Sequence, residues 1–289
     1  MSGRLGVERT VAGLRRRIAE LRAKGLSIGL APTMGALHAG HVSLVDAGRA
    51  RGDAVVATIF VNPTQFGPNE DFAAYPRDEV ADFALLEKSG AALVFAPDVR
   101  EMYPEPGLTT VHVAELTSGL CGPFRPDHFD GVATVVTKLF LASLPDRAYF
   151  GEKDYQQLQV VRRLARDLKL PIEVVGCPTV RESDGLAMSS RNRYLNPAER
   201  AAAPAMHCSL IALAEAVSAG ADCRAAEVEA RATLLTAGFG PVDYVAVVDA
   251  ESLAPVDRVT RPSRALAAAR LGKARLIDNV AVAAAASRR

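Results

Sequence analysis

The stretch LSIGLAPTMGALHAGHVSLVDAGRA, from Leu26 to Ala50, contains a short apolar run, a turn and a helical pattern in that order. Leu26–Leu30 is apolar throughout, which is typical of a strand covered on both faces of a parallel sheet. The segment His41–Ala50 has the apolar spacing of a helix. We therefore predict a strand, a turn and a helix that begins near His38, which together form the first βα unit of an α/β fold.

The same alternation continues along the chain. Further apolar runs predict strands at 54–61, 91–95, 148–150 and 172–175. Helical patterns lie between them at 78–88, 132–144 and 155–168. Strands that alternate with helices are typical of βαβ units, so we expect a parallel sheet with helices packed on it.

The pattern changes after about Val180. Alanine-rich helical stretches at 197–219 and 225–237 are followed by apolar strands at 244–248 and 274–282. We therefore predict two domains, a larger α/β domain over 1–179 and a smaller α+β domain over 180–289.

The composition is that of a globular protein, with 49% apolar and 23% charged residues in a chain of 289. Lys and Arg number 34 against 33 Asp and Glu, so no net positive field attracts nucleic acid or an anionic membrane. No apolar stretch approaches the roughly 20 residues that a membrane span needs. We expect no nucleic-acid partner and no membrane segment.

The cysteines, Cys121, Cys177, Cys208 and Cys223, form no C-x-x-C pair and have no histidine at zinc-finger spacing. They indicate neither a disulfide framework nor a structural zinc site. Near the N-terminus, Arg15–Arg17 lie in a helical pattern with acidic neighbours, which favours a surface helix over a transit peptide. Reduced thiols and the lack of a secretory apolar region predict a cytoplasmic protein.

Two of the five histidines, His38 and His41, stand three residues apart at the start of the first predicted helix. Three interpretations compete: a metal pair, a buried pair of imidazoles, and a pair that binds phosphate at a helix N-terminus. No third ligand lies at a recognisable spacing, which disfavours zinc. A helix N-terminus beyond the carboxyl end of a parallel strand favours an anion, and residues at i and i+3 share a face.

Two later stretches also suit a polyphosphate. RESDGLAMSSRNRYL (181–195) places Ser189 and Ser190 beside Arg191, where hydroxyls and a guanidinium are phosphate donors. A linker with a helix cap at Ser183 or Asn196 is the alternative. YFGEKDYQQLQVVRRL (149–164) ends a predicted strand in GEKD, where a lysine supplies a point charge for phosphate or the acidic residues cap the helix.

Together these elements resemble the HIGH and KMSKS motifs of the nucleotidyltransferase superfamily. More narrowly, the chain resembles the pantothenate synthetase family in PTMGALHAGHVSLV (32–45), IFVNPTQFG (59–67), YPRD (75–78), HFDGVATVVTKLF (128–140), GEKDYQQL (151–158), PTVRESDGLAMSSRNRYL (178–195) and YVAVVD (244–249). The motifs run through most of the chain in the family's order. Ala39, where many members have an acidic residue, and Cys121 depart from the family pattern.

The resemblance implies a Rossmann-like N-terminal domain, a smaller C-terminal domain that closes over the site, a homodimer, and Mg²⁺ with ATP. It also implies two steps, in which pantoate attacks the α-phosphorus of ATP and the amine of β-alanine then displaces AMP. Among the catalytic candidates, His38, His41, Lys153, Ser189, Ser190 and Arg191, the resemblance makes His41 the proton donor. The ATP site that it implies consists of Pro32, Thr33, Met34, Gly35, Ala36, Leu37, His38, Ala39, Gly40, His41, Gly151, Glu152, Lys153, Asp154, Val180, Met188, Ser189, Ser190 and Arg191.

For the hydroxy acid we predict contacts from Gln65 and Gln157, because an amide donates to a carboxylate and accepts from a hydroxyl. Asn62 and Met34 complete the predicted substrate site, and Asp82 is the candidate Mg²⁺ ligand. Two other functions stay open at this point. One is another nucleotidyltransferase of the HIGH type, and the other is a nucleotide sensor without catalysis.

Overall fold

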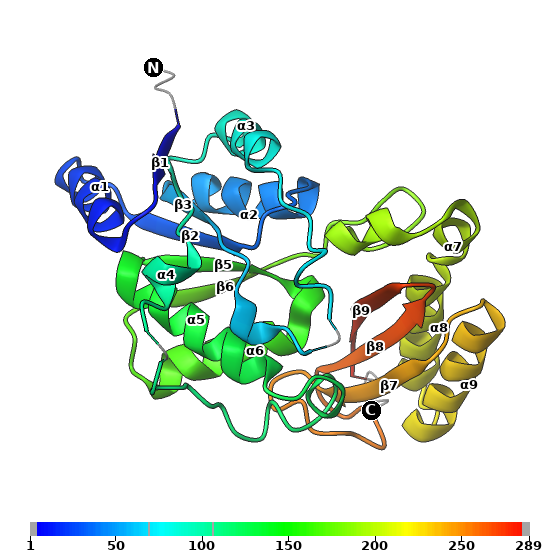
Figure 1. Ribbon diagram of the computed structural model, residues 1–289. Helices are drawn as coiled ribbons and strands as arrows, with labels where there is room; N and C mark the ends of the chain where they lie inside the picture. Colours follow the sequence, from blue (N-terminus) through cyan, green and yellow to red (C-terminus); the bar gives the residue numbers. More distant parts are fainter. Residues whose placement is uncertain (1–4, 69, 106, 285–289) are drawn as a thin grey trace. The chain divides into compact units, whose positions relative to one another are not determined.

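The computed structural model describes residues 5–68, 70–105 and 107–284 (Figure 1). The chain forms two compact units. The first comprises the chain up to residue 114 with 125–152 and 160–178; the second comprises 115–124, 153–159 and the chain from 179 onward. The main division lies next to the predicted boundary, but the second unit also includes two segments that precede it in sequence.

Gln156 explains why these two segments belong together. Its amide nitrogen donates to the carbonyls of Leu116 and Gly119, each at 2.9 Å. Its amide oxygen accepts from the backbone N–H of Cys121 at 3.0 Å. One buried side chain therefore joins 115–124 to the start of the helix that follows Lys153.

The first unit is built on a six-stranded sheet in the order β1-β4-β3-β2-β5-β6, and all its paired strands are parallel. The strands are β1 (Gly6–Glu8), β2 (Ile28–Thr33), β3 (Ala54–Ile59), β4 (Leu93–Phe95), β5 (Arg147–Gly151) and β6 (Glu173–Cys177). Residues of β2, β3 and β4 are almost entirely buried, as the apolar runs predicted. The predicted α/β fold is confirmed.

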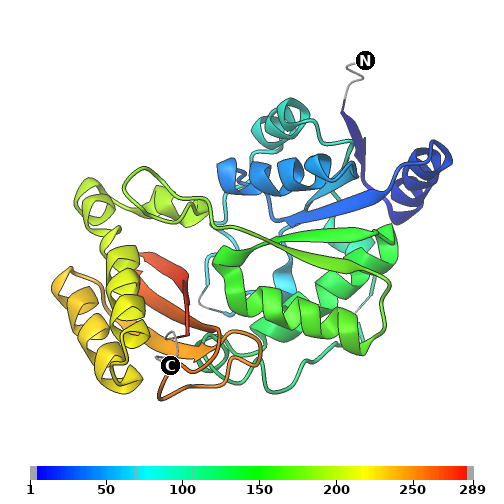
Figure 2. The ribbon, with the colours of Figure 1, turned by 180° about the vertical axis from the view of Figure 1, so that it is seen from behind.

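The helices that connect these strands are α1 (Val11–Ala23), α2 (Ala39–Ala50), α3 (Glu79–Ser89), α4 (Val99–Met102), α5 (His128–Ser143) and α6 (Tyr155–Asp167), with the 3₁₀ turns η1 (Pro63–Gln65) and η3 (Glu152–Asp154). Residues 153–159, in η3 and the start of α6, are counted with the second unit. Two opposite views show α2 and α3 on one face of the sheet and α5 and α6 on the other (Figure 1, Figure 2). This division follows from the right-handed crossover rule, because the chain leaves β2 and β5 in opposite directions along the sheet. The carboxyl ends of these two neighbouring strands are the switch point at which such sheets bind ligands.

The sequence patterns did not predict β1 and α4. Each is only three or four residues long, which is too short for an apolar period to be recognised. The other strands and helices associated with this sheet lie at the predicted places, with ends shifted by a few residues.

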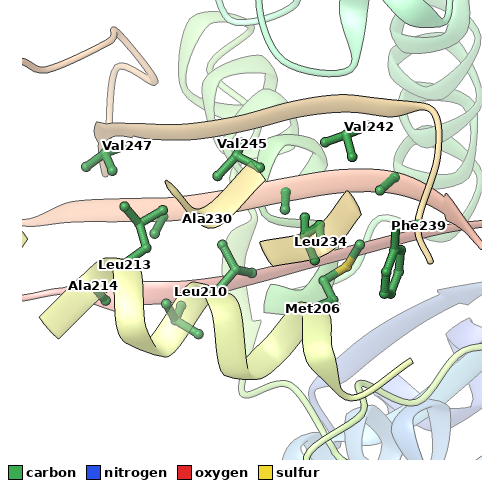
Figure 3. Close-up of a cluster of buried hydrophobic side chains, with 14 of the residues drawn as sticks. Met206, Leu210, Leu213, Ala214, Ala230, Leu234, Phe239, Val242, Val245 and Val247 are labelled. Carbon is green, nitrogen blue, oxygen red and sulfur yellow. The ribbon is translucent and has the colours of Figure 1, made fainter. Parts of the chain in front are cut away.

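The second unit has an antiparallel sheet in the order β7-β8-β9, with strands β7 (Val242–Asp249), β8 (Ser263–Leu271) and β9 (Ala274–Val282). Its other elements are η2 (Gly122–Phe124), η4 (Ser190–Tyr194), α7 (Pro197–Ala202), α8 (Ala205–Ser218) and α9 (Cys223–Thr236). Side chains of α8 and α9 meet those of β7 in one apolar core (Figure 3), with Leu210, Leu234 and Val247 at most 1% exposed. The predicted smaller α+β part is thus confirmed.

Strand β8 was missed because its sequence, SRALAAARL, is rich in alanine, which is uncommon in strands. The period of two is nevertheless present. Ala265, Ala267 and Ala269 belong to the core shared with α8 and α9, whereas Leu266 faces a second cluster with Tyr155. Small side chains on one face suit a close approach between sheet and helices.

Residues 197–218, which include α7 and α8, contain an 18-residue window with a mean hydropathy of 1.3 and are long and apolar enough to cross a membrane by length and composition alone. From the sequence we expected no apolar stretch close to the length of a membrane span, and by length and hydropathy that expectation was wrong. Met206, Leu210, Leu213 and Val217 of α8 are nevertheless buried in the core of the second unit. Their burial identifies α8 as a core helix.

Candidate active site

The turn between β2 and α2 is held by Asp82 of α3. Its two carboxylate oxygens accept from the backbone N–H groups of Ala36, at 2.9 Å, and Leu37, at 2.8 Å. Gly35 has φ +81°, and a Cβ there would lie 2.9 Å from Asp82 Oδ2. Asp82 is 4% exposed, and its carboxylate binds the backbone of the loop after β2. This geometry gives no support to a role as a Mg²⁺ ligand.

His38 and His41 form a reciprocal cap at the start of α2. Nδ1 of His38, the N-cap residue, accepts from the backbone N–H of Gly40 at 3.1 Å. Nδ1 of His41 accepts from the backbone N–H of His38 at 3.3 Å, and the ring centroids are 4.1 Å apart. A nitrogen that accepts carries no hydrogen, so each neutral ring has its N–H at Nε2.

This geometry bears on the three interpretations of the pair. Both rings are partly exposed, which is not the condition of a buried pair. Among the described residues, no group of three or more His, Cys, Asp and Glu could hold a metal ion. Two Nε2–H donors at one helix N-terminus, at the carboxyl end of β2, suit an anion such as phosphate.

Three of the predicted substrate residues lie together after β2 and β3. The Gln65 amide nitrogen lies 3.2 Å from Met34 Sδ, and Asn62 Nδ2 donates to Gln65 Oε1 at 3.1 Å. Asn62 also donates to the carbonyl of Gly131 at 3.1 Å and accepts from the Tyr103 hydroxyl at 2.9 Å. The amide of Gln65 is thereby oriented by Met34 and by Asn62, and Gly131 and Tyr103 in turn hold Asn62.

A chain of polar contacts from Glu70 through Arg125 and His128 to the backbone of Gln65 was not predicted from the sequence. Arg125 binds Glu70 through two contacts of 2.6 Å and lies 2.9 Å from His128 Nε2. His128 Nδ1 lies 2.8 Å from the carbonyl of Gln65. Because arginine only donates, Nε2 of His128 accepts and Nδ1–H donates to Gln65. HFDGVATVVTKLF contains His128, but nothing local to that stretch indicates its partners.

In the second unit, the predicted phosphate loop is a small hairpin followed by η4. Met188 N donates to Val180 O at 2.9 Å, which closes the hairpin. Ser189 is the N-cap of η4, and its hydroxyl accepts from the backbone N–H of Arg191 at 3.3 Å. Ser190 is 8% exposed. The alternative cap is also present, because Asn196 and Glu199 form a capping box on α7.

Lys153 and Ser189 line one small cavity of the second unit. Its other lining residues are Leu186, Ala187, Asn192, Met206, Leu276, Ile277 and Asp278. Lys153 Nζ lies 3.7 Å from Asp154 Oδ2, with the lysine side chain 20% exposed. The structure thus brings a cation and a hydroxyl from two distant segments to the same place.

The predicted site residues are divided between the units. The first unit contains Pro32–His41, Asn62, Gln65, Asp82, Gly151 and Glu152, and the second contains Lys153, Asp154, Gln157, Val180 and Met188–Arg191. Gln157 lies on α6, with its side chain half-buried, and belongs to a different unit from Gln65.

Comparison with known proteins gives one family. A sequence model described as pantoate-beta-alanine ligase matches residues 6–281. The pantothenate synthetase of Paramagnetospirillum magneticum is 58% identical over 282 residues, which are 98% of this chain and 99% of that protein. The pantothenate synthetase of Rhizorhabdus wittichii is 55% identical over 96% of this chain and 98% of its own.

Solved structures agree with these sequence matches. Pantothenate synthetase from Thermus thermophilus superposes with a TM-score of 0.88 at 48% identity, over 96% of this chain and 99% of that one. A pantoate-beta-alanine ligase from Francisella tularensis, complexed with beta-gamma ATP and beta-alanine, has a TM-score of 0.79 at 31% identity, over 96% and 97% of the two chains.

Proposed function

This chain belongs to the pantoate–β-alanine ligase family, and from that membership we infer that it condenses (R)-pantoate with β-alanine to pantothenate, with conversion of ATP to AMP and pyrophosphate. The observation that carries this most directly is the reciprocal cap of His38 and His41, with both Nδ1 atoms occupied by backbone N–H groups. This arrangement supports Nε2–H donors at the N-terminus of α2, where the phosphates of ATP would bind.

We propose that the first step is attack of a pantoate carboxylate oxygen on the α-phosphorus. A new P–O bond forms, the bond to the β-phosphate oxygen breaks, and pyrophosphate leaves with the electron pair. Positioned donors stabilise the charge that develops on the phosphoryl oxygens and on the leaving group. We assign this work to His38, His41, Lys153, Ser189 and Ser190 with Arg191, and proton donation to His41.

In the second step the amine of β-alanine attacks the acyl carbon of pantoyl adenylate. The acyl–oxygen bond breaks, AMP leaves with that oxygen, and the amine loses a proton. Asn62 contacts the side-chain amide of Gln65, and His128 contacts its backbone carbonyl. The Gln65 amide is therefore held in position and is suited to keep the pantoyl group in place. We assign Gln157 and Met34 to the same substrate site.

Mg²⁺ would neutralise phosphate charge when bound with ATP. It usually keeps several waters and is bound through substrate phosphates with one or two carboxylates. The absence of a cluster of three or more metal-binding side chains among the described residues is compatible with that mode. Asp82 is left out of this proposal, because both its oxygens accept from the loop backbone.

The family resemblance further supports a cytoplasmic homodimer in which the second unit closes over the site. Light scattering of the purified protein tests the dimer directly.

The test of the reaction is an oxygen label. Pantoate labelled with heavy oxygen in its carboxylate is incubated with ATP and β-alanine, and the products are analysed by mass spectrometry. We expect one labelled oxygen in AMP, unlabelled pyrophosphate and no ADP, because the acyl–oxygen bond breaks in the second step.

Label in inorganic phosphate together with ADP would indicate attack on the γ-phosphorus and would refute the proposal. Pyrophosphate release that needs another acceptor in place of pantoate would favour another nucleotidyltransferase. Nucleotide binding without any turnover would favour the sensor.

A further inference from the structure

Two adjacent residues on β9, Asp278 and Asn279, have no part in the proposed mechanism, yet both are deeply buried. Asp278 is 4% exposed and Asn279 is 2% exposed. A buried carboxylate or amide is costly unless its polar atoms are paired. The identity of their partners therefore indicates what they do.

Asp278 holds the hairpin that precedes the Ser189 loop. Arg181 donates to both of its oxygens, at 2.6 and 2.9 Å. Arg181 also donates to the carbonyl of Gly185 in the hairpin turn, at 3.0 Å, and to that of Asn279, at 3.3 Å. One carboxylate on β9 thus anchors both the start and the turn of the hairpin 180–188.

The carboxylate itself is kept charged. Burial by itself would raise the pKa of Asp278, but His207 and Arg181 outweigh it and hold that pKa below its usual range. His207 Nδ1 lies 3.5 Å from Asp278 Oδ2. A charged acceptor for the arginine fork is therefore present at neutral pH.

Asn279 holds the backbone of Lys153. Its amide nitrogen donates to the Lys153 carbonyl at 2.9 Å. Its amide oxygen accepts from Arg264 Nε at 2.7 Å, and the Arg264 guanidinium stacks 4.2 Å from the Tyr155 ring centroid. Because Arg264 only donates, the amide orientation is set, and the nitrogen faces Lys153.

These contacts converge on the cavity that Lys153, Ser189 and Asp278 line together. We propose that Asp278 and Asn279 are positioning residues for adenylate formation. The two residues are neighbours on one strand. Asn279 holds the backbone of Lys153 and Asp278 holds the hairpin that leads to Ser189, so the distance between these two segments stays constant. This rests on the proposed function of those two groups.

The physical reason is that charge stabilisation depends on distance. The strand β9 pairs with β8 along its whole length, so it is a fixed support for both contacts. A displacement of about 1 Å at a catalytic group can cost about 10²-fold in rate. The first step depends on the phosphate donors, whereas attack of β-alanine on a formed acyl adenylate makes no new charge on pyrophosphate.

The experiment measures the two steps separately in Asn279→Asp, Asp278→Asn and Arg181→Lys. Asn279→Asp keeps an acceptor for Arg264 but loses the donor to Lys153. Arg181→Lys keeps a positive charge beside Asp278 but loses the fork. Pyrophosphate release with pantoate and ATP reports the first step, and pantothenate formation from supplied pantoyl adenylate and β-alanine reports the second.

The matched control is Asp243→Asn, which removes a partly buried carboxylate from another arginine in the same sheet, since Arg275 Nε lies 2.8 Å from Asp243 Oδ2. We expect pyrophosphate release to fall about 10- to 100-fold in the three test variants, with the second step within about twofold of the wild type. Asp243→Asn should leave both steps unchanged even where it lowers the melting temperature as much as Asp278→Asn does.

Equal losses in both steps, or a wild-type rate of pyrophosphate release in folded variants, would refute the positioning role. If a buried-site variant does not fold, Arg181→Lys decides, because Arg181 is partly exposed and its substitution keeps the charge. A wild-type protein that releases no pyrophosphate with pantoate would instead refute the proposed function.

Discussion

At the scale of single residues, each histidine of the α2 pair has two tasks. Nδ1 completes the helix cap, and that contact leaves the ring hydrogen on Nε2. Stability and chemistry therefore depend on different atoms of the same ring. Substitutions can separate them.

His41→Ala and His38→Ala are expected to lower pyrophosphate release at least about 10²-fold, because each removes a donor to the transition state. His38→Ala should also lower stability by about 1 kcal/mol through loss of the N-cap acceptor. His38→Asn is the control, since asparagine is a good N-cap without an imidazole. It should restore the melting temperature but not the rate, and a near-normal rate in His38→Asn would remove His38 from the catalytic set.

At the scale of elements, the position of Gln65 depends on how closely η1 packs on α5. Gly131 is the point of contact: a Cβ there would lie 2.3 Å from the Thr64 carbonyl oxygen and 2.8 Å from Gln65 Cα. The same helix supplies His128, which contacts the Gln65 carbonyl. Glycine at this point lets two elements from different parts of the chain hold one amide.

Gly131→Ala is therefore expected to displace η1 and to raise the KM for pantoate about 10-fold, while the KM for ATP stays within about twofold. Overpacking should also lower the free energy of unfolding by about 1–3 kcal/mol. Gly107→Ala is the matched control, because nothing lies within 4 Å of a Cβ at Gly107. Parallel rises in both KM values would show that the change acts on the fold as a whole.

At the scale of the whole molecule, stability to alkali depends on groups that burial keeps neutral. Burial, with a smaller contribution from the charge of Glu152, raises the pKa of Cys177 from about 9 to about 11. Burial and the contact with Asp53 raise the pKa of Tyr149 as well. Both residues belong to the apolar core of the first unit.

When the pKa of a thiol is higher in the folded protein than in the unfolded chain, the thiol ionises at a lower pH in the unfolded chain. Its contribution to stability is complete below about pH 9 and is lost as the pH rises to about 11. As the pH rises from 8 to 11, the free energy of unfolding should therefore fall less in Cys177→Ala than in the wild type, and the two losses should differ by about 2 kcal/mol. Melting temperatures across that range measure it, and Cys208→Ala, which changes an exposed thiol, is the control. Parallel curves for Cys177→Ala and the wild type would contradict the burial argument.

Local patterns were sufficient for the first βα unit, the parallel sheet and the smaller α+β part, because apolar spacing and turn residues act over a few neighbouring positions. They failed at β8, whose alanines are strand residues only because α8 and α9 pack on them. The family motifs pointed to His38, His41, Lys153 and Ser189 as candidates, and those assignments stay predictions. Motifs of this kind are read from short segments and do not identify their supports.

Tertiary structure alone decided which side chains hold the candidate site. Asp82 reaches a loop 46 residues away, Arg125 a carbonyl 60 residues away, and Arg181 a carboxylate 97 residues away. No periodicity or spacing relates such partners, because they meet only when the sheet and helices have packed. The sequence offered Asp82 only as a candidate Mg²⁺ ligand, and only the packed structure shows that both its oxygens accept from the backbone N–H groups of Ala36 and Leu37.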